Sequence, residues 1–451
     1  MKKFMSLMEK FLMPLAKAIG ENKYLIAIRD GFLISTPMLI IGSIFLLIAN
    51  FPIPIWNTWM THLLGDDWAT KMSMPASASF DVMTILAVVG IAYSLGRLLE
   101  IDAIAAGVMS LVLFFIVTPL TIDFTPEGTD KLYHVAGLPM QWMGSRGLFL
   151  GIIVALLGTR LFAIFVKKGW VIKMPAGVPP TVVKSFESLI PGFLVITIFF
   201  IISWLFSITP FGSVQDFIYQ FLQYPLVKLG NTLGAMIVAY LFLHFFWFFG
   251  INGSSVVGAV FNPVLRALSL ENLDAFKHGE KLPNIITGDF QDMFATFGGA
   301  GSTLSLIVVM LIVCKSQRTK KLSQLSLVPG IFGINEPIIF GLPIVLNPII
   351  LIPFVIVPTI NIIITYFAMD WGLVPFTNGI QLPWTTPIII SGLLVSGWQG
   401  AVLQVILFVL GMFIYYPFIK VLDKQYLEEE KKANEKEDED ISFDDIDFES
   451  L

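Results

Sequence analysis

Residues 371–419 read WGLVPFTNGIQLPWTTPIIISGLLVSGWQGAVLQVILFVLGMFIYYPFI and contain no Asp, Glu, Lys or Arg. A membrane-crossing helix needs about 20 predominantly apolar residues, so this stretch has the length for two crossings. Helices satisfy their backbone hydrogen bonds internally, which suits them to cross a lipid bilayer. Charge-free stretches recur at residues 31–65, 188–215, 229–265, 293–314 and 337–369. The sequence therefore predicts an all-α polytopic membrane protein.

The composition supports the same fold class. The chain of 451 residues is 56% hydrophobic and 14% charged, whereas soluble proteins carry about 25% charged residues. The net charge of −5 is uneven, because residues 428–451 hold twelve acidic residues and three lysines, which leaves +4 for the rest. We predict that this acidic end is a disordered cytoplasmic tail.

Nine apolar stretches are predicted membrane spans. They lie near residues 32–51, 82–99, 103–120, 148–166, 189–206, 233–250, 302–314, 342–367 and 401–419. Lysine and arginine gather before the first span, after the fourth at Lys167, and in the cluster that begins at Lys315. Because cytoplasmic loops carry the excess of Lys and Arg, we expect these loops and both termini on the cytoplasmic side.

This orientation requires a further excursion into the membrane. Six spans return the chain to the cytoplasm at Gly250, and a single span cannot then end at a cytoplasmic Lys315. Residues 251–301 must add a crossing, or enter the membrane and return. This segment, 328–343 and 375–387 are all interrupted by Gly and Pro, which are tolerated at membrane depth where backbone is buried in protein or lines a cavity. Ordinary loops between spans are the alternative.

Four parts of the chain follow from this pattern. Residues 1–30 form a basic, amphipathic cytoplasmic segment, and residues 423–451 contain the acidic tail. The smoother spans of residues 31–210 are expected to form a scaffold, and the interrupted spans of residues 211–422 the substrate-binding half.

The strongest candidate for function is the segment GINEPIIFG at residues 333–341. Glu336 is the only charged residue between Leu322 and Met369, and a carboxylate at membrane depth costs about 2.5–3.5 kcal/mol on insertion scales. Glycine and proline around it suit a hairpin tip that presents Asn335 and Glu336 to a cavity. The alternative is a surface loop acid, but loops in this chain usually carry several charges.

A second candidate is the segment HFFWFFGINGSS at residues 244–255. If the helix breaks near Gly250, Trp247 and Asn252 can face one cavity, and an indole offers a flat apolar face with one N–H donor for a sugar ring. A lipid-facing role is the alternative for Trp247. His244 equally suits helix packing.

A third candidate is the polar but uncharged segment TNGIQLPWTTP at residues 377–387. Amides such as that of Gln381, hydroxyls, and the indole of Trp384 are typical of a site for a neutral polyol. A turn between spans is the alternative. Asp289 and Asp292 are weaker candidates.

Several classes of function lack their signals. There is no Gly-Lys dipeptide for a nucleotide P-loop, and the four histidines show no metal-ligand spacing, so we expect no cofactor and no metal. No basic stripe suits a nucleic acid. The single cysteine, Cys314, ends an apolar run and is typical of a small packing residue.

The segment GINEPIIFGLP at 333–343 resembles the signature of phosphotransferase system enzyme IIC proteins of the lactose/cellobiose/diacetylchitobiose (oligo-β-glucoside) family. Supporting matches are AIRDGF at 27–32, DAIAAG at 102–107, SFESLIPG at 185–192 and WFFGI at 247–251. The resemblance extends from about Ala27 to Leu422, and its motifs are long and in order.

The resemblance implies about ten membrane helices, two re-entrant hairpins and a homodimer formed through the amino-terminal half. It implies a permease in the bacterial cell membrane that holds one disaccharide in its carboxy-terminal half. Transport is coupled to phosphoryl transfer from a cysteine of cytoplasmic enzyme IIB to the sugar, with enzymes IIB and IIA expected on separate chains. It places Glu336 at the sugar hydroxyls, with Asn335, Trp247 and Trp384 lining the pocket, and Cys314 lacks the context of the enzyme IIB cysteine.

One departure from the family pattern concerns Asn252, which stands where the family usually has a histidine near the reacting hydroxyl. An amide forms hydrogen bonds but cannot take a proton near neutral pH. Glu336 is then the expected general base. Phosphoryl transfer rests mostly on positioning and charge stabilisation, so Asn252 is compatible with it.

Two other functions fit the same residues. An ion-coupled or facilitative transporter without phosphotransfer would use Glu336 or Asp292 as proton carrier. A membrane sensor would bind sugar without moving it and would use the acidic tail as its output. Uptake that depends on a phosphoryl donor distinguishes the permease from both.

Overall fold

The computed structural model describes residues 18, 21–49, 54–126, 131–175, 177–249, 252–342, 344 and 347–444. Most of the predicted segment 1–30 lies outside the described residues. Among those described, eight helices are long and apolar enough to cross a membrane. A ninth arises if Val214–Gly230 and Leu233–Trp247, which meet at 78°, are one broken span. The all-α polytopic class is confirmed, while the count of ten and the two re-entrant hairpins stay predictions.

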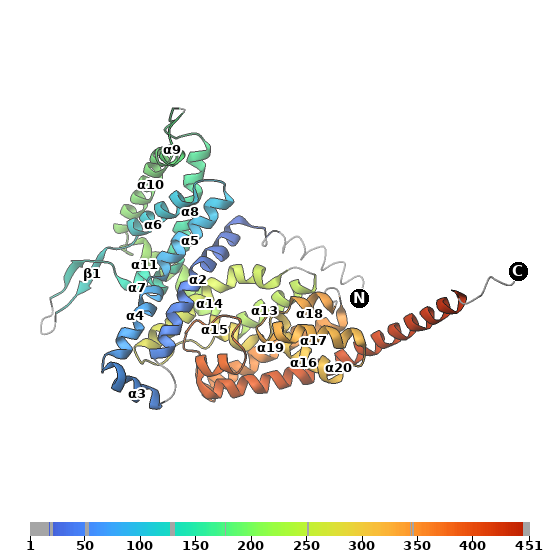
Figure 1. The fold of residues 1–451 in the computed structure, drawn as a ribbon. Helices are drawn as coiled ribbons and strands as arrows, with labels where there is room; N and C mark the ends of the chain where they lie inside the picture. The colour runs from blue at the N-terminus through green and yellow to red at the C-terminus, as the bar shows by residue number, and fades with distance from the viewer. Residues whose placement is uncertain are drawn as a thin grey trace. The chain divides into compact units, whose positions relative to one another are not determined.

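The chain forms two compact units. Unit 1 contains residues 1–235, 255–289 and 377–382, and unit 2 contains residues 236–254, 290–376 and 383–451. Figure 1 shows the helices of both units, coloured by residue number along the chain. The structure does not test the predicted boundary at residue 210 or the roles of the two halves.

Unit 1 holds the amino-terminal helices. They are α2 (Lys23–Ala49), α3 (Pro54–Leu64), α4 (Trp68–Phe80), α5 (Met83–Leu98), α6 (Ala103–Val117), α7 (Met140–Met143), η1 (Ser145–Gly147), α8 (Leu148–Lys167), α9 (Pro180–Glu187) and α10 (Leu189–Ser207). A broken run follows as α11 (Val214–Ile218), η2 (Tyr219–Gln223), α12 (Tyr224–Gly230) and the start of α13 (Leu233–Phe248). Its last helices are α14 (Gly253–Lys277) and α15 (Gly288–Phe290).

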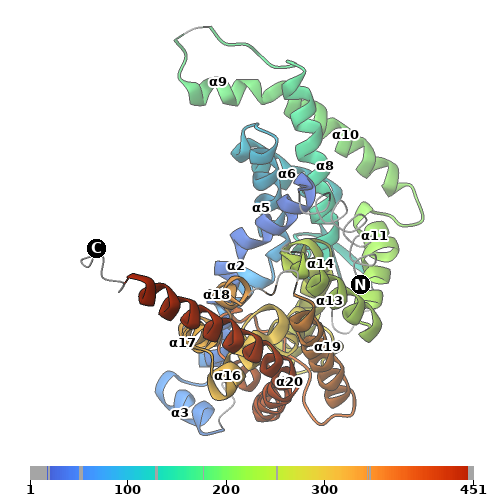
Figure 2. The same ribbon diagram turned by 90° about the vertical axis from the view of Figure 1, so that its right-hand side faces the viewer.

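Small residues allow α2 and α5 to pack closely. A Cβ on Gly31 would lie 2.5 Å from the backbone of Ile91, and one on Gly90 would lie 2.5 Å from the Gly31 carbonyl oxygen. Such contact is available only to glycine and is typical of membrane helix crossings. Figure 2 shows α2, α5, α6 and α8 side by side.

A single hairpin interrupts the helices of unit 1. Strands β1 (Thr121–Phe124) and β2 (Tyr133–Ala136) pair antiparallel, with Thr121 opposite Ala136. Its side chains are largely exposed, including Phe124 and Tyr133.

The segment 251–301, where the predicted orientation requires a further excursion into the membrane, contains the helix α14, one of the eight candidate spans. That this helix crosses the membrane stays a prediction. Its far end packs in a core with α2 and α4 through Leu39, Phe80 and Leu273. Asn272 then ties the helix to two loops of the same unit: its Nδ2 donates to the carbonyls of Asn284 and Thr377, both at 2.8 Å. This bond brings residues 377–382 into unit 1.

Unit 2 holds the interrupted segments of the second half. After most of α13 come η3 (Gln291–Ala295), η4 (Ala300–Ser302), α16 (Thr303–Val313), α17 (Gln317–Ile331), α18 (Glu336–Gly341), α19 (Pro348–Asp370) and α20 (Ile390–Asp444). The segment η3 is a π-helix, and α20 is kinked at Ser396 and Gly397. Helices α16, α17, α19 and α20 cluster around the η3–η4 loop (Figure 1).

The helix α20 enters the acidic segment after residue 423, for which disorder stays a prediction. The helix continues to Asp444 and projects beyond α16 and α17 (Figures 1 and 2). The Asp423 carboxylate accepts hydrogen bonds from the backbone N–H groups of Lys315 and Ser316. Two turns further, Glu430 accepts from the Arg318 N–H. The bonds to Ser316 and Arg318 satisfy N–H groups at the start of α17, and all three bonds tie this part of α20 to that end of α17.

Candidate functional site

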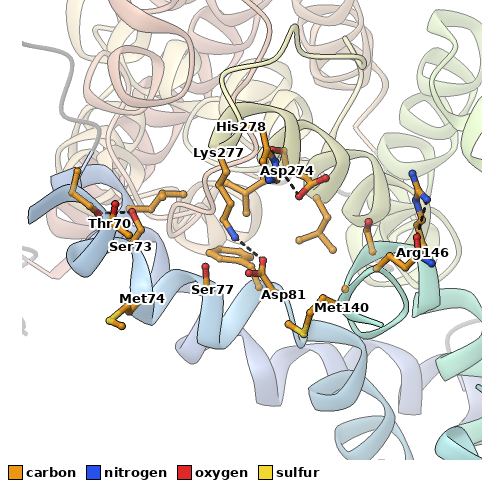
Figure 3. Close-up of a pocket in the computed structure, with 18 residues that line it drawn as sticks. Thr70, Ser73, Met74, Ser77, Asp81, Met140, Arg146, Asp274, Lys277 and His278 are labelled. Atoms are coloured by element: carbon orange, nitrogen blue, oxygen red, sulfur yellow. Dashed lines mark hydrogen bonds and ion pairs between the residues drawn. The ribbon is translucent and has the colours of Figure 1, made fainter. Parts of the chain in front are cut away.

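A large cavity lies in unit 1, and none of the predicted site residues is in its lining. It has a volume of about 960 Å³ and opens between α4, α7 and the end of α14 (Figure 3). Two of its charged groups form a close pair, with Lys277 Nζ 2.6 Å from Asp81 Oδ1, and His278 Nδ1 lies 3.6 Å from Asp274 Oδ1 at an exposed position. Arg146 donates to Gln141. The contacts indicate a structural role for these charges.

A smaller cavity in unit 2 is lined by two of the predicted site residues, Asp292 and Trp384, and not by Asn335 or Glu336. Its volume is about 90 Å³, and its lining includes Asp292, Thr296, Gly299, Gly333, Trp384 and Thr386. Small-molecule pockets usually measure about 300–1,000 Å³, so the cavity covers only part of a disaccharide. Asp292 comes from η3, Gly299 from the loop before η4, and Trp384 from the segment before α20.

Glycines bring the walls of this cavity together. Gly299 has φ +89, and a Cβ there would lie 2.6 Å from Asn335 Cγ. Gly333 has φ +80, and its Cβ would lie 3.2 Å from the Trp384 ring. Left-handed backbone at both positions favours glycine. The turn before Glu336 therefore packs between the glycine loop and the indole.

Asn335 precedes α18 and is 6% exposed. Its side chain does not cap the helix; Nδ2 donates instead to the Ala300 carbonyl at 2.9 Å. Glu336 is the first residue of α18, and its side chain lies outside what the structure describes. Its position next to Asn335 puts its backbone beside the glycine loop.

Trp247 and Asn252 occupy the break between α13 and α14. Trp247 is 8% exposed, and its Nε1 lies 3.5 Å from Ser254 Oγ, at the limit of a hydrogen bond. Asn252 is exposed. Neither residue lines the 90 Å³ cavity.

Gln381 belongs to unit 1, as does the weaker candidate Asp289, whereas unit 2 contains Trp247, Asn252, Asp292, Asn335, Glu336 and Trp384. Gln381 is 4% exposed, and its Nε2 has no hydrogen-bond partner among the residues that the structure describes. The segment 377–387 is thus divided, with Thr377 bound in unit 1 and Trp384 at the cavity in unit 2.

Sequence reasoning missed the buried polar groups behind the cavity. Gln404 of α20 accepts from the N–H groups of Ile389 and Gly392 and donates to the Met293 carbonyl and Ser391 Oγ. This amide joins η3 to the start of α20. Its contact with Met293 spans 111 residues, so no local pattern indicates it.

Cys314 lies at the cytoplasmic end predicted for α16. Burial, with a smaller contribution from the Asp423 carboxylate, raises the pKa of its thiol to about 12. The thiol therefore stays protonated at neutral pH and is a poor nucleophile. Among the residues described, no group of three His, Cys, Asp or Glu side chains is placed to hold a metal ion.

Comparisons with known proteins agree with this fold. The model of the family "Phosphotransferase system, EIIC" matches residues 29–358. The chain is 42% identical over 436 residues to the cellobiose-specific EIIC component of Geobacillus stearothermophilus, covering 96% of this chain and 97% of the relative. It is 41% identical to the lichenan permease IIC component of Bacillus subtilis strain 168, covering 95% and 96%.

A lactose-specific EIICB component of Staphylococcus epidermidis strain ATCC 35984 is 33% identical over 95% of this chain and 73% of that protein. The crystal structure of the transporter ChbC, the IIC component from the N,N'-diacetylchitobiose-specific phosphotransferase system, superimposes with a TM-score of 0.92 at 44% identity. That match covers 94% of this chain and 99% of the other.

Proposed function

Because the chain belongs to the EIIC family of the phosphotransferase system, we propose that its unit 2 cavity binds the β-linked disaccharide that this permease carries. The family resemblance drawn from the signature at 333–343 is confirmed, and the permease function is supported over the ion-coupled transporter and the sensor. We propose in addition which residues form the sugar site, which proteins are its partners, and how the chain is oriented in the membrane.

The packing of the Gly333–Glu336 turn between Gly299 and Trp384 carries the proposal. Trp384 is 62% exposed at the cavity, and an exposed indole face suits a sugar ring. The hydroxyl of Thr386 and the carboxylate of Asp292 add hydrogen-bonding groups to the same lining. Few charges and several neutral polar groups match a polyol better than an ionic substrate.

Glu336 acts in this proposal as the proton acceptor for the sugar hydroxyl. It is the only acid from Leu322 to Met369, and Asn252 replaces the base expected from the family with an amide. The phosphoryl group passes from the enzyme IIB cysteine to that hydroxyl oxygen, whose proton passes to Glu336. Positioning and charge stabilisation carry most of such a transfer.

Enzymes IIB and IIA are proposed as partners on separate chains. Relatives named EIICB join the B and C components in one protein, which supports direct contact between the two. Cys314 is protonated at neutral pH and does not substitute for the enzyme IIB cysteine. We further propose a homodimer in the bacterial cytoplasmic membrane with both termini in the cytoplasm, supported by the Lys and Arg clusters near Lys167 and Lys315.

The test is uptake into sealed membrane vesicles that contain the full chain. Radiolabelled cellobiose, diacetylchitobiose, lactose and a β-mannobiose would be supplied, with or without internal phosphoenolpyruvate and the soluble relay proteins. We expect sugar phosphate only with the complete relay. Free sugar that accumulates without the relay would contradict the coupling and favour ion-coupled transport.

Glu336→Gln tests the assigned base. The amide keeps the size of the side chain and one acceptor oxygen but cannot accept a proton, so sugar binding should persist while phosphorylation falls by a factor of about 10²–10⁴. Glu428→Gln, an exposed change on α20, is the matched control. Full phosphorylation by the Glu336 variant would refute its role.

A further inference from the structure

The peptide group of Gly301 is held at both ends by buried side chains. His244 Nε2 accepts a hydrogen bond from the Gly301 N–H at 3.0 Å. Tyr415 Oη donates to the Gly301 carbonyl at 2.5 Å. Both side chains are fully buried, and they come from α13 and α20, so two distant helices fix one peptide.

His244 is itself oriented by its other ring nitrogen. Nδ1 lies 2.8 Å from the Tyr240 carbonyl, one helical turn earlier. A carbonyl only accepts, so Nδ1 carries the proton and Nε2 is left as the acceptor for Gly301. The ring also packs edge-on against Phe354 at a centroid distance of 5.3 Å.

The loop that these residues hold has a backbone that needs support. Gly298, Gly299 and Gly301 have φ values of +72, +89 and +80, and Ser302, which is not glycine, has φ +54. Non-glycine residues in the left-handed region persist only where surrounding structure fixes them. A Cβ on Gly301 would lie 2.1 Å from the Phe354 ring, so the loop is also pressed against α19.

The same loop forms one wall of the unit 2 cavity. Gly298 and Gly299 line it, and the Ala300 carbonyl accepts from Asn335 Nδ2. Neither His244 nor Tyr415 lines the cavity. A shift of the Gly301 peptide would therefore reach both the wall at Gly299 and the Asn335–Glu336 turn.

We infer that His244 and Tyr415 are positioning residues that set the geometry of the sugar site through the Gly301 peptide. The inference rests on the proposed function of the unit 2 cavity. Their side chains bind the N–H and the carbonyl of Gly301, and they come from α13 and α20 rather than from the loop itself. The two residues therefore tune affinity for sugar without touching it.

The first test compares two tyrosines of α20. Tyr415→Phe removes only the hydroxyl that binds the Gly301 carbonyl, and Tyr416→Phe removes a hydroxyl that faces Lys420 at an exposed position. Relay-dependent uptake by the full chain in vesicles gives KM and kcat. We expect Tyr415→Phe to raise KM about 3–30-fold, the range of a lost buried hydrogen bond, with kcat within about twofold and Tyr416→Phe unchanged.

The second test uses rescue at His244. His244→Gln keeps an acceptor near the position of Nε2, and His244→Leu fills similar space without one. We expect the leucine variant to raise KM like Tyr415→Phe and the glutamine variant to restore most of the affinity. The double variant His244→Leu/Tyr415→Phe should show less than the product of the two effects, because both act on one peptide.

Three outcomes decide the inference. A KM that stays at the wild-type value in Tyr415→Phe and His244→Leu, with only thermal stability or the amount of folded protein reduced, would overturn it. Equal KM values for the glutamine and leucine variants would also overturn it. Failure of the wild-type chain to transport any β-disaccharide with the relay would instead remove the proposed function, which separates the two claims.

Discussion

The contact between α20 and the start of α17 leads to a prediction whose size can be worked out. Asp423 is 6% exposed, and its two oxygens accept three hydrogen bonds, from the N–H groups of Lys315 and Ser316 and from Thr319 Oγ1, at 2.8–3.0 Å. A carboxylate beside the first N–H groups of a helix also interacts favourably with the helix dipole. Asp423 is therefore the main support for this end of α17.

Asp423→Asn replaces one carboxylate oxygen with an NH₂ group. This group donates and cannot accept the hydrogen bond that the oxygen accepts in the unchanged chain. One hydrogen bond to a charged group, worth about 1.5–3 kcal/mol, is lost, and the helix-dipole interaction of about 0.3–1 kcal/mol is lost with it. The free energy of unfolding should fall by about 2–4 kcal/mol. At about 2.1 cal/mol/K per residue, a chain of 451 residues loses about 2–4 °C in Tm.

The assay is thermal unfolding of the purified full chain at several heating rates, because membrane proteins often unfold irreversibly. Glu429→Gln removes an acidic charge from an exposed position on the same helix and should leave Tm unchanged. Relay-dependent uptake would be measured in parallel, since α17 leads directly into the Gly333–Glu336 turn. An Asp423→Asn protein with the Tm of the control would refute the reasoning that this carboxylate anchors α17.

Three further predictions test other parts of the fold. Gly299→Ala should reduce relay-dependent uptake at least about tenfold, because its Cβ would meet Asn335, whereas Gly234→Ala, which faces open space, should transport normally. Lys277→Met should lower stability by about 1–2 kcal/mol, since Asp81 is left half-buried without its partner, and a changed KM for sugar would contradict the structural role of the large cavity. Cys314 should resist a maleimide from pH 7 to 9, because a thiol with a pKa of about 12 stays protonated; labelling only after denaturation in detergent would agree, and fast native labelling would not.

The sequence alone predicts the fold class because Asp, Glu, Lys and Arg are absent from stretches as long as a membrane span. Such a pattern lies within one continuous stretch of the chain and needs no knowledge of distant contacts. It does not locate α14 as a span. That helix is less apolar than the other candidate spans and carries Arg266, Glu271 and Asp274. Orientation required a further excursion between residues 251 and 301, and the helix is found there.

The candidate site was predictable only in part, and the reason lies in the distance of the contacts along the chain. Asp292 and Trp384 line the cavity, and their residue types suggested it. The bond of Tyr415 to Gly301 spans 114 residues, and Tyr415 sits in an apolar run without a motif. Gln381 is of a suitable residue type, yet it is packed in unit 1.

The acidic end of α20 also shows that long-range contacts cannot be predicted from the sequence alone. Its composition is typical of a solvated segment, but Asp423, Tyr426 and Glu430 are spaced three and four residues apart and share one helix face. Asp423 and Glu430 cap α17, and Arg318 lies 4.4 Å above the Tyr426 ring. Composition alone predicts disorder, and the spacing indicates a helix only once a partner is known.

The two units provide partners for their polar side chains in different ways. This difference bears on which substrate the protein selects. In unit 1 opposite charges pair with each other, as Lys277 does with Asp81. Charged groups that are paired in this way are not available to bind a ligand in the large cavity. Unit 2 binds its buried His244, Tyr415 and Gln404 to backbone groups, and these bonds fix the shape of the wall without reaching the cavity. Side chains that do reach it, such as that of Trp384, can then change without altering the loop. Related proteins could then share the shape of this wall and differ in the side chains that line the cavity. Their names include cellobiose, oligo-β-mannosides and lactose.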